Sequence, residues 1–240
     1  MTDTAPQNTD AKPAAGFTVD AILFDLDGTL IDSTIATERA WTAWGAQMGL
    51  PGYKHTLHGL TAQSLVGKLI EEPRHAEALK LITRLEVEDT LGIHVKDGVR
   101  RMLASIPEDR WTIVTSCTDE LAAARLAAAE LGHPAHMVTA DQVSTGKPSP
   151  EGFLLAARRL GVDIRRCLVV EDAPAGLSAG RAAGAHTLAV TGTYGADVLS
   201  ADTIVESLDR VDVSATADGS LLVSFDSRPL DVSITTPPSD

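Results

Sequence analysis

Cysteine, basic residues and long apolar runs are all scarce in this chain of 240 residues. Its two cysteines, Cys117 and Cys167, lie far apart without a CxxC or Cys/His spacing, which argues against a disulfide framework or a thiolate metal site. Both are expected to be reduced thiols in the core, because cysteine is commonly buried. The net charge of −13 argues against a nucleic-acid partner, since binding a phosphate backbone requires clustered Lys and Arg.

Membrane and export signals are also lacking. No apolar run approaches the roughly 18 residues that a membrane span needs, and the first residues have no basic segment followed by an apolar core. We therefore expect a cytoplasmic protein without a membrane partner, as a monomer or a weak homo-oligomer. Residues 1–17 are rich in Thr, Pro, Ala, Asn and Asp without periodicity, which predicts a disordered leader.

The rest of the chain predicts an α/β fold. Residues 19–26 carry an unbroken apolar centre that suits a parallel strand covered on both faces. Residues 34–95 show helical patterns only, whereas strands and helices alternate in residues 96–210. This alternation predicts a doubly wound parallel sheet built from residues 18–33 and 96–210, with 34–95 inserted as an all-helical cap. The expected later strands are 111–116, 136–140, 166–172, 186–190 and 201–208, and the expected helices between them are 119–132, 149–161 and 173–184.

Residues 211–240 follow a different pattern. The segment GSLLVSFDSRPLDVSI alternates apolar and polar residues on both sides of Asp226-Ser227, which predicts a β-hairpin-like extension. Such an extension could cover a sheet edge or pair with another chain. The last few residues are expected to be frayed.

Polar residues gather where the predicted strands end. The first strand ends in Asp-Leu-Asp, the second in Thr-Ser and a later one in Glu-Asp, and a lysine lies in the loop before a helix. The carboxyl ends of parallel strands meet at one edge of a sheet, so these side chains are expected to converge. Converging carboxylates repel one another unless a cation lies among them, and an oxygen-only ligand set indicates Mg²⁺. Positioning and neutralising charge is most of what phosphoryl transfer requires, so that reaction class is expected.

Each of these motifs has a purely structural interpretation when taken alone. An Asp-x-Asp sequence is usually a turn, and Glu-Asp before a helix is often an N-cap. Their order is what makes them informative. The segments DLDGTLIDS, VTS, GKPSP and VVEDAPAG resemble the four ordered motifs of the haloacid-dehalogenase superfamily, in the subgroup with a helical cap after the first motif.

The resemblance covers about residues 20–205 and implies a Rossmann-like core, Mg²⁺ and an aspartyl-phosphate intermediate. The pattern is similar to that of sugar- and polyol-phosphate phosphatases, so a small phosphorylated metabolite is the expected substrate. It implies that Asp25 is the nucleophile and binds the metal with its other oxygen. Asp27 is then the general acid and base, with its backbone carbonyl on the metal. Asp172 is implied as a direct ligand, Glu171 as a ligand through water, and Lys147 as the partner of nucleophile and phosphate.

Further roles follow from the same resemblance. Thr115 is expected to bind a phosphoryl oxygen, helped by the backbone N–H groups of Ser116 and Leu26. Thr29 is expected to support the first loop by hydrogen bonding, and Gly28 to give that loop conformational freedom.

The cap is expected to choose the substrate through its most polar loop, KHTLHGLTAQSL. His58-Gly59 resembles the His-Gly of the cap loop in sugar and polyol phosphatases, and both residues are candidate substrate contacts. The arginine that commonly follows there is replaced by the segment 60–63, LTAQ, which leaves the substrate open. His58 could equally be a half-buried loop histidine.

Other residues near the cap are interpreted structurally. Asp32 is expected to stabilise the start of a helix, although a substrate contact is the alternative. Trp41 and Trp44 lie one turn apart and are expected to pack within the cap, with sugar stacking as the alternative. His55, like the neighbouring lysines of its loop, is expected to be solvated.

The same fold also occurs in proteins of three other kinds. A haloacid dehalogenase lacks an acid at the position of Asp27, so the sequence speaks against it. A β-phosphoglucomutase-like phosphotransferase has both aspartates but typically carries a histidine where this chain has Thr37. A non-catalytic binding or interaction module on the same fold is the alternative of another class, because a fold alone does not establish a function.

Overall fold

The computed structural model of this protein describes residues 15–225. Residues 15–17, predicted to belong to a disordered leader, instead lie in a strand, β1 (Ala15–Val19). β1 pairs with the strand β10 (Leu221–Phe225), which is about 200 residues away in the chain, and the composition of residues 1–17 gives no information on such a partner. The rest of the predicted leader and the predicted turn at Asp226-Ser227 lie outside the described residues.

A parallel sheet of five strands forms the centre of the molecule, in the order β5-β2-β6-β7-β8. Its second strand is buried on both faces: Ile22 and Phe24 pack into one apolar cluster, and Ala21 and Leu23 into another. This explains the unbroken apolar run in the sequence and confirms the predicted α/β class with a doubly wound sheet. The strands are β2 (Ala21–Phe24), β5 (Trp111–Ile113), β6 (Cys167–Glu171), β7 (His186–Val190) and β8 (Thr203–Val205).

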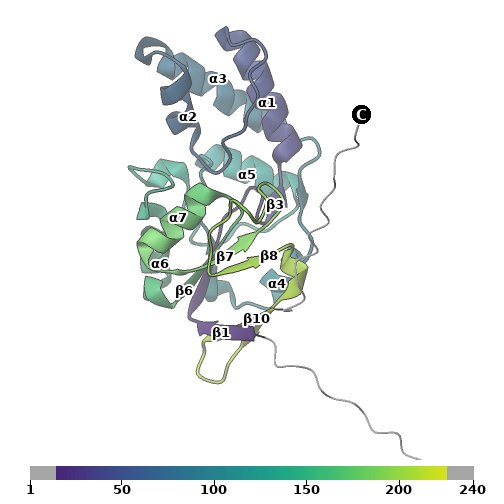
Figure 1. The fold of residues 1–240 in the computed structure, drawn as a ribbon, viewed down its shortest axis with the longest axis vertical. Helices are drawn as coiled ribbons and strands as arrows, with labels where there is room; N and C mark the ends of the chain where they lie inside the picture. Colours follow the sequence, from purple (N-terminus) through teal and green to yellow (C-terminus); the bar gives the residue numbers. More distant parts are fainter. Residues whose placement is uncertain (1–14, 226–240) are drawn as a thin grey trace, which may run out of the picture.

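Helices cover the sheet on both sides (Figure 1). Three were predicted and are present with slightly shifted ends, whereas α4 was not predicted, because its six residues are too short to show a helical period. The predicted strand 136–140 is reduced to a single bridge between Val138 and Val114. The helices are α4 (Val99–Ala104), α5 (Asp119–Ala128), α6 (Glu151–Leu160) and α7 (Pro174–Ala183), with short 3-10 turns at Glu108–Arg110, Ala140–Gln142, Ile164–Arg166 and Leu208–Arg210.

Three helices stand above the carboxyl edge of the sheet as a separate layer (Figure 1). They are α1 (Thr34–Met48), α2 (Ala62–Leu69) and α3 (His75–Glu88), with a 3-10 turn at Glu72–Arg74. They share their own apolar cluster, in which the fully buried Trp44 donates a hydrogen bond from Nε1 to the carbonyl of Ala78 at 2.9 Å. The tryptophans therefore pack within this layer, as predicted.

The connection between the helical layer and the core contains a small sheet that was not predicted. Strand β3 (Ile31–Asp32) pairs antiparallel with β4 (His94–Val95), so the end of the segment 34–95 is not helical. Two-residue strands carry no periodicity in the sequence. This pairing places the two segments that connect the core to the helical layer side by side.

A three-stranded sheet, of order β1-β10-β9, lies at the end of the core opposite the helical layer (Figure 1). Strands β9 (Val211–Ala215) and β10 (Leu221–Phe225) form a hairpin whose turn contains Gly219 at φ +83°. The predicted turn at Asp226-Ser227 lies outside the described residues, so this hairpin is not the one that the sequence predicted. Among the described residues, β10 pairs with β9 on one side and with β1 on the other.

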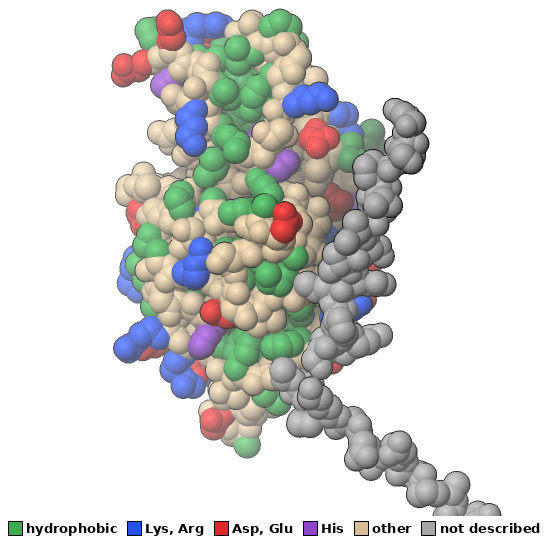
Figure 2. Space-filling model, viewed as in Figure 1, with side chains coloured by type: hydrophobic (Ala, Val, Ile, Leu, Met, Phe, Trp, Pro, Cys, Tyr) green, Lys and Arg blue, Asp and Glu red, His purple; other side chains and the backbone are tan. Residues whose placement is uncertain are grey.

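No helix within residues 15–225 is long and apolar enough to cross a membrane. On the face shown in Figure 2, lysine and arginine side chains are scattered among acidic ones and form no basic field.

Candidate active site

The carboxyl ends of β2 and β6, together with the loop before α6, bring four of the expected site residues into one buried cluster, namely Asp25, Glu171, Asp172 and Lys147. The Nζ atom of Lys147 lies 2.5 Å from Oδ1 of Asp25 and 2.6 Å from Oε1 of Glu171, and it also donates to the carbonyl of Val114 at 3.0 Å. Burial alone would lower the pKa of Lys147, but the two carboxylates raise it above its usual value. The lysine therefore stays cationic and binds the nucleophile candidate directly.

The acidic cluster fits a divalent cation. One oxygen each of Asp25, Glu171 and Asp172 lie within 4.8 Å of one another, and all three residues are buried. Burial and the charge of Glu171 raise the pKa of Asp25 well above its usual range and that of Asp172 to about 7. Among the described residues, Oδ2 of Asp172 has no hydrogen-bond partner. A buried, unpaired carboxylate oxygen beside two other carboxylates is what Mg²⁺ would satisfy.

Two glycines leave room for this cluster. A Cβ on Gly28, which has φ +84°, would lie 1.9 Å from Oδ2 of Asp172. A Cβ on Gly176, in the first turn of α7, would lie 1.6 Å from Oε1 of Glu171. The positive φ of Gly28 supports its predicted role. Gly176 was not identified from the sequence, because it looks there like an ordinary small residue of a helix.

Asp27 is held apart from this cluster by contacts on both of its oxygens. Ser33 donates from Oγ to Oδ1 at 2.6 Å, while the Cys117 thiol and Nη1 of Arg125 lie 2.9 and 2.8 Å from Oδ2. Burial would raise the pKa of Asp27, but Arg125 and the Cys117 and Ser33 hydrogen bonds outweigh it and lower the pKa. The Asp27 side chain is not part of the group formed by Asp25, Glu171 and Asp172, so only its backbone carbonyl remains for the expected metal contact.

The remaining core candidates surround the cluster. Thr115 is buried and lines the cavity above it, and its Oγ1 accepts a hydrogen bond from the N–H of Cys117 at 3.1 Å. The side chain of Leu26 lies in the apolar core, so only its backbone could meet a substrate. Thr29 Oγ1 lies 3.5 Å from Oδ1 of Asp172, which ties the first loop to β6.

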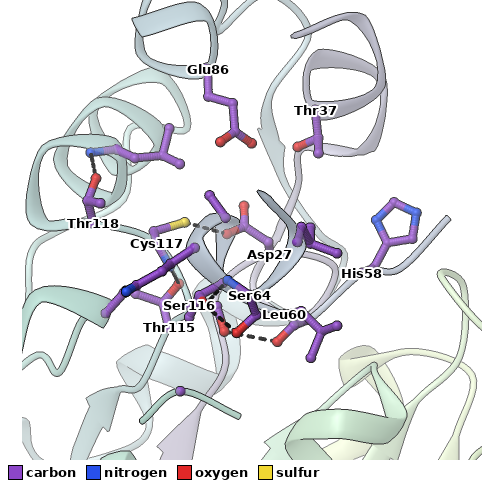
Figure 3. Close-up of a pocket in the computed structure, with 18 of the residues that line it drawn as sticks. Asp27, Thr37, His58, Leu60, Ser64, Glu86, Thr115, Ser116, Cys117 and Thr118 are labelled. Atoms are coloured by element: carbon purple, nitrogen blue, oxygen red, sulfur yellow. Dashed lines mark hydrogen bonds between the residues drawn. The ribbon is translucent and has the colours of Figure 1, made fainter. Parts of the chain in front are cut away.

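A cavity of about 490 Å³ separates the cluster from the helical layer. Both layers line it, and Figure 3 shows His58 and Leu60 at one side of it and Thr115 and Ser116 below. The cap loop touches the core: Ser116 donates from Oγ to the carbonyl of Gly59 at 2.9 Å, and the N–H of His58 donates to the Tyr194 hydroxyl at 3.2 Å. The structure thus places His58 and Gly59 at the cavity, with the cap loop closed onto the core.

His55 departs from the prediction that it is solvated. It is only 8% exposed, lines the cavity and stacks on Trp41 with ring centroids 5.0 Å apart. Burial lowers its pKa to about 4, with smaller contributions from His58 and Arg125, so the ring is neutral at physiological pH. A histidine in a polar loop of the sequence gives no indication that its ring is buried in this way.

Sequence reasoning also missed the partners of Asp27. Arg125 lies on α5 and Glu86 on α3, and both line the cavity although each is less than 10% exposed. Arg125 reads in the sequence as one charge on an alanine-rich helix. Its contact with the first motif requires the three-dimensional fold.

Known proteins share this arrangement. The haloacid dehalogenase-like hydrolase family matches residues 19–184. Hexitol phosphatase A of Escherichia coli (strain K12) is 38% identical over 212 residues, which cover 84% of this chain and 97% of that protein. The 2-deoxyglucose-6-phosphate phosphatase 1 of Saccharomyces cerevisiae is 30% identical over 87% of this chain and 96% of that protein. The crystal structure of a hydrolase from Pseudomonas syringae aligns with a TM-score of 0.71 at 27% identity, covering 79% of this chain and 94% of that one.

The fold and the family match together define the class. This chain belongs to the haloacid dehalogenase-like hydrolases, and its relatives include sugar- and polyol-phosphate phosphatases, as the motifs predicted.

Proposed function

We propose that this protein is a Mg²⁺-dependent phosphatase that hydrolyses a small sugar or polyol phosphate through a phosphate ester on Asp25. The observation that carries this proposal is the buried cluster in which Lys147 binds Asp25 and Glu171 beside the unpaired oxygen of Asp172. Such a site holds a nucleophilic carboxylate, a cation for phosphate and an acidic metal pocket under one cavity.

In the first step, an oxygen of Asp25 attacks phosphorus and the bond from phosphorus to the leaving oxygen breaks. Lys147 and the Thr115 hydroxyl bind the phosphoryl oxygens, on which negative charge accumulates. A protonated Asp27 gives its proton to the leaving alcohol. Mg²⁺ held by Asp25, Asp172 and, through water, Glu171 would supply neutralisation of the negative charge.

In the second step, water attacks the phosphorus of the ester and releases Asp25 and inorganic phosphate. Asp27, now a carboxylate, takes a proton from that water and is returned to its starting state. The lowered pKa of Asp27 suits this base role, because it favours the ionised carboxylate. Ser33 and Arg125 fix the side chain on the cavity side of the loop.

The proposed substrate class rests on the relatives and on the cavity. Hexitol phosphatase A and 2-deoxyglucose-6-phosphate phosphatase 1 are named for six-carbon substrates, and a cavity of about 490 Å³ is large enough for a ligand of that size. Hydroxyl-rich substrates require polar partners, and the lining offers His58, Gln63 and Ser64 from the cap.

A panel of phosphate esters tests the proposal. It would contain sorbitol 6-phosphate, 2-deoxyglucose 6-phosphate, glycerol 1-phosphate and β-glucose 1-phosphate, assayed for phosphate release with Mg²⁺ and with EDTA. We expect Mg²⁺-dependent release from the sugar or polyol esters. Conversion of β-glucose 1-phosphate to glucose 6-phosphate without phosphate release would favour the mutase alternative.

A matched pair of variants makes the test specific. Asp25→Asn should abolish release, because an amide is a poor nucleophile. Asp32→Asn is the control, since the Asp32 side chain accepts a hydrogen bond from the N–H of Thr34 at the start of α1 and lies outside the cavity lining. An inert but folded wild type across the whole panel would contradict the proposed activity.

A further inference from the structure

Arg125 is the centre of a buried network that joins the core to the helical layer. Its guanidinium lies 2.8 Å from Oδ2 of Asp27 and 3.0 Å from Oε1 of Glu86, and it donates to Oγ1 of Thr37 at 2.9 Å. It also lies 3.2 Å from the sulfur of Cys117. One side chain thus contacts two core residues and two cap residues.

The cap partners come from two different helices. Thr37 lies in the first turn of α1 and Glu86 near the end of α3, and Figure 3 shows both pointing from the cap toward Asp27. Arg125 approaches from α5 of the core. The network therefore exists only while the cap lies on the core as it does here.

Because the network is buried, separating its cap residues from Arg125 is unfavourable. Arg125 is 4% exposed and Glu86 is 7% exposed, so both charges are largely shielded from bulk water. If the cap moved away, Glu86 and Thr37 would leave the guanidinium, and an incompletely paired buried charge is unfavourable. The guanidinium would then be free to turn, and Asp27 would lose one of the groups that fix its carboxylate.

We propose that Arg125 is a positioning residue that couples closure of the cap to placement of the Asp27 carboxylate, with Glu86 and Thr37 holding the guanidinium. The inference rests on the proposed function, in which Asp27 transfers the protons. It adds a requirement: proton transfer to the leaving group is efficient only when the cap is seated through Glu86.

Leaving groups that differ in their need for a proton separate this role from a structural one. An alkoxide from a polyol phosphate needs the Asp27 proton as the phosphorus–oxygen bond breaks. The nitrophenolate from 4-nitrophenyl phosphate leaves without it. Misplacing Asp27 should therefore slow phosphoryl transfer from the first substrate far more than from the second.

The experiment compares single-turnover phosphoryl transfer from sorbitol 6-phosphate, or the best alkyl ester of the panel, with that from 4-nitrophenyl phosphate. For Arg125→Met we expect a loss of about 100-fold or more with the alkyl ester, the scale of general acid catalysis, and a loss of less than about fivefold with the aryl ester. Glu86→Gln should give the same selectivity with a smaller loss of roughly tenfold. Arg39→Met is the matched control, because Arg39 forms an exposed ion pair with Asp89 away from the cavity.

A double variant tests whether Glu86 acts through Arg125. Adding Glu86→Gln to Arg125→Met should cause little further loss, because the group that transmits its effect is already absent. Arg125→Lys should recover part of the alkyl activity, since it restores a cation near Asp27. If Arg125→Met does not fold, Arg125→Lys and Glu86→Gln carry the comparison.

The outcomes are distinguishable. Equal losses with both esters in an otherwise active enzyme, or additive effects of the two changes, would overturn the coupling and leave the phosphatase function standing. A wild type inactive toward both esters would overturn the proposed function, and this inference with it.

Discussion

At the scale of single residues, the acidic cluster depends on atoms that are missing as much as on those present. Glu171 accepts hydrogen bonds from the N–H groups of Asp172 and Ala173 and from Lys147, so its carboxylate cannot move aside easily. The absent side chain of Gly176 is what leaves space for it. Motif recognition identified the acids, but only the packed helix reveals why a glycine follows them.

Gly176→Ala should weaken Mg²⁺ binding by about tenfold or more, the usual effect of disturbing the surroundings of a metal ligand. The new methyl group would collide with Glu171 Oε1 and push the carboxylate from its three donors. Titration calorimetry with Mg²⁺ would measure the change. Gly67→Ala is the control, because a Cβ in that helix has its nearest contact at 4.0 Å. Unchanged affinity in Gly176→Ala would contradict the assignment of Glu171 to the metal site.

At the scale of elements, long periodic segments were predictable and short ones were not. The helices from Thr34, Ala62 and His75 and the strand ending at Glu171 follow from apolar spacing. The strands β3 and β4 and the helix α4 are too short to carry a period. The hairpin of β9 and β10 was not predicted, because alternation alone does not identify a strand's partner, which here includes β1 from the other end of the described chain.

Trp44→Ala should destabilise the protein by about 3–5 kcal/mol, as expected for removing a fully buried large side chain. Trp44 joins α1 to α3 through packing and through its hydrogen bond to Ala78, so the cap should loosen first. Urea unfolding followed by fluorescence and circular dichroism would measure it. Ile35→Ala on the same helix is the control, since Ile35 is 65% exposed and should change the stability by less than about 0.5 kcal/mol. Similar effects from the two changes would be inconsistent with the cap core described above.

At the scale of the whole molecule, the buried cluster of Asp25, Glu171 and Asp172 makes stability depend on pH and on metal. The family and α/β fold were predicted from motifs, because ordered strand ends carry the chemistry. The contact of Arg125 with Asp27 and Glu86 was not, since no sequence spacing links these three positions. The cytoplasmic location and the monomeric or weakly oligomeric state stay predictions.

In EDTA, the free energy of unfolding should fall as the pH rises from about 4 to about 7. Burial and Glu171 raise the pKa of Asp172 to about 7 in the folded state, against 3.8 as its ordinary value, so the folded protein binds the proton more tightly than the unfolded chain. The stability from that proton is present below pH 4 and is lost as the pH rises through 7. Asp25, whose pKa is also raised, adds to this fall, whereas His55, whose pKa burial lowers to about 4, opposes it because the unfolded chain binds that proton more tightly. Carboxyl groups with lowered pKa, such as Asp27, act only at more acidic pH.

Urea unfolding between pH 5 and 8, with and without Mg²⁺, would measure this dependence. Mg²⁺ should oppose this decrease in the free energy of unfolding, because it binds the ionised carboxylates of the folded state and not those of the unfolded chain. A metal-free stability that rises over this interval would contradict the raised carboxyl pKa values of the cluster as the dominant contribution.

The central claim is that Asp25 carries the phosphoryl group during turnover. An enzyme reaction quenched in acid and then reduced with borohydride should convert a phosphorylated aspartate to homoserine, which peptide mapping by mass spectrometry locates. We expect homoserine at position 25 in the Mg²⁺ reaction and none in EDTA or in Asp25→Asn. Phosphate release at the wild-type rate by Asp25→Asn, or reduction at a different carboxylate, would contradict the account.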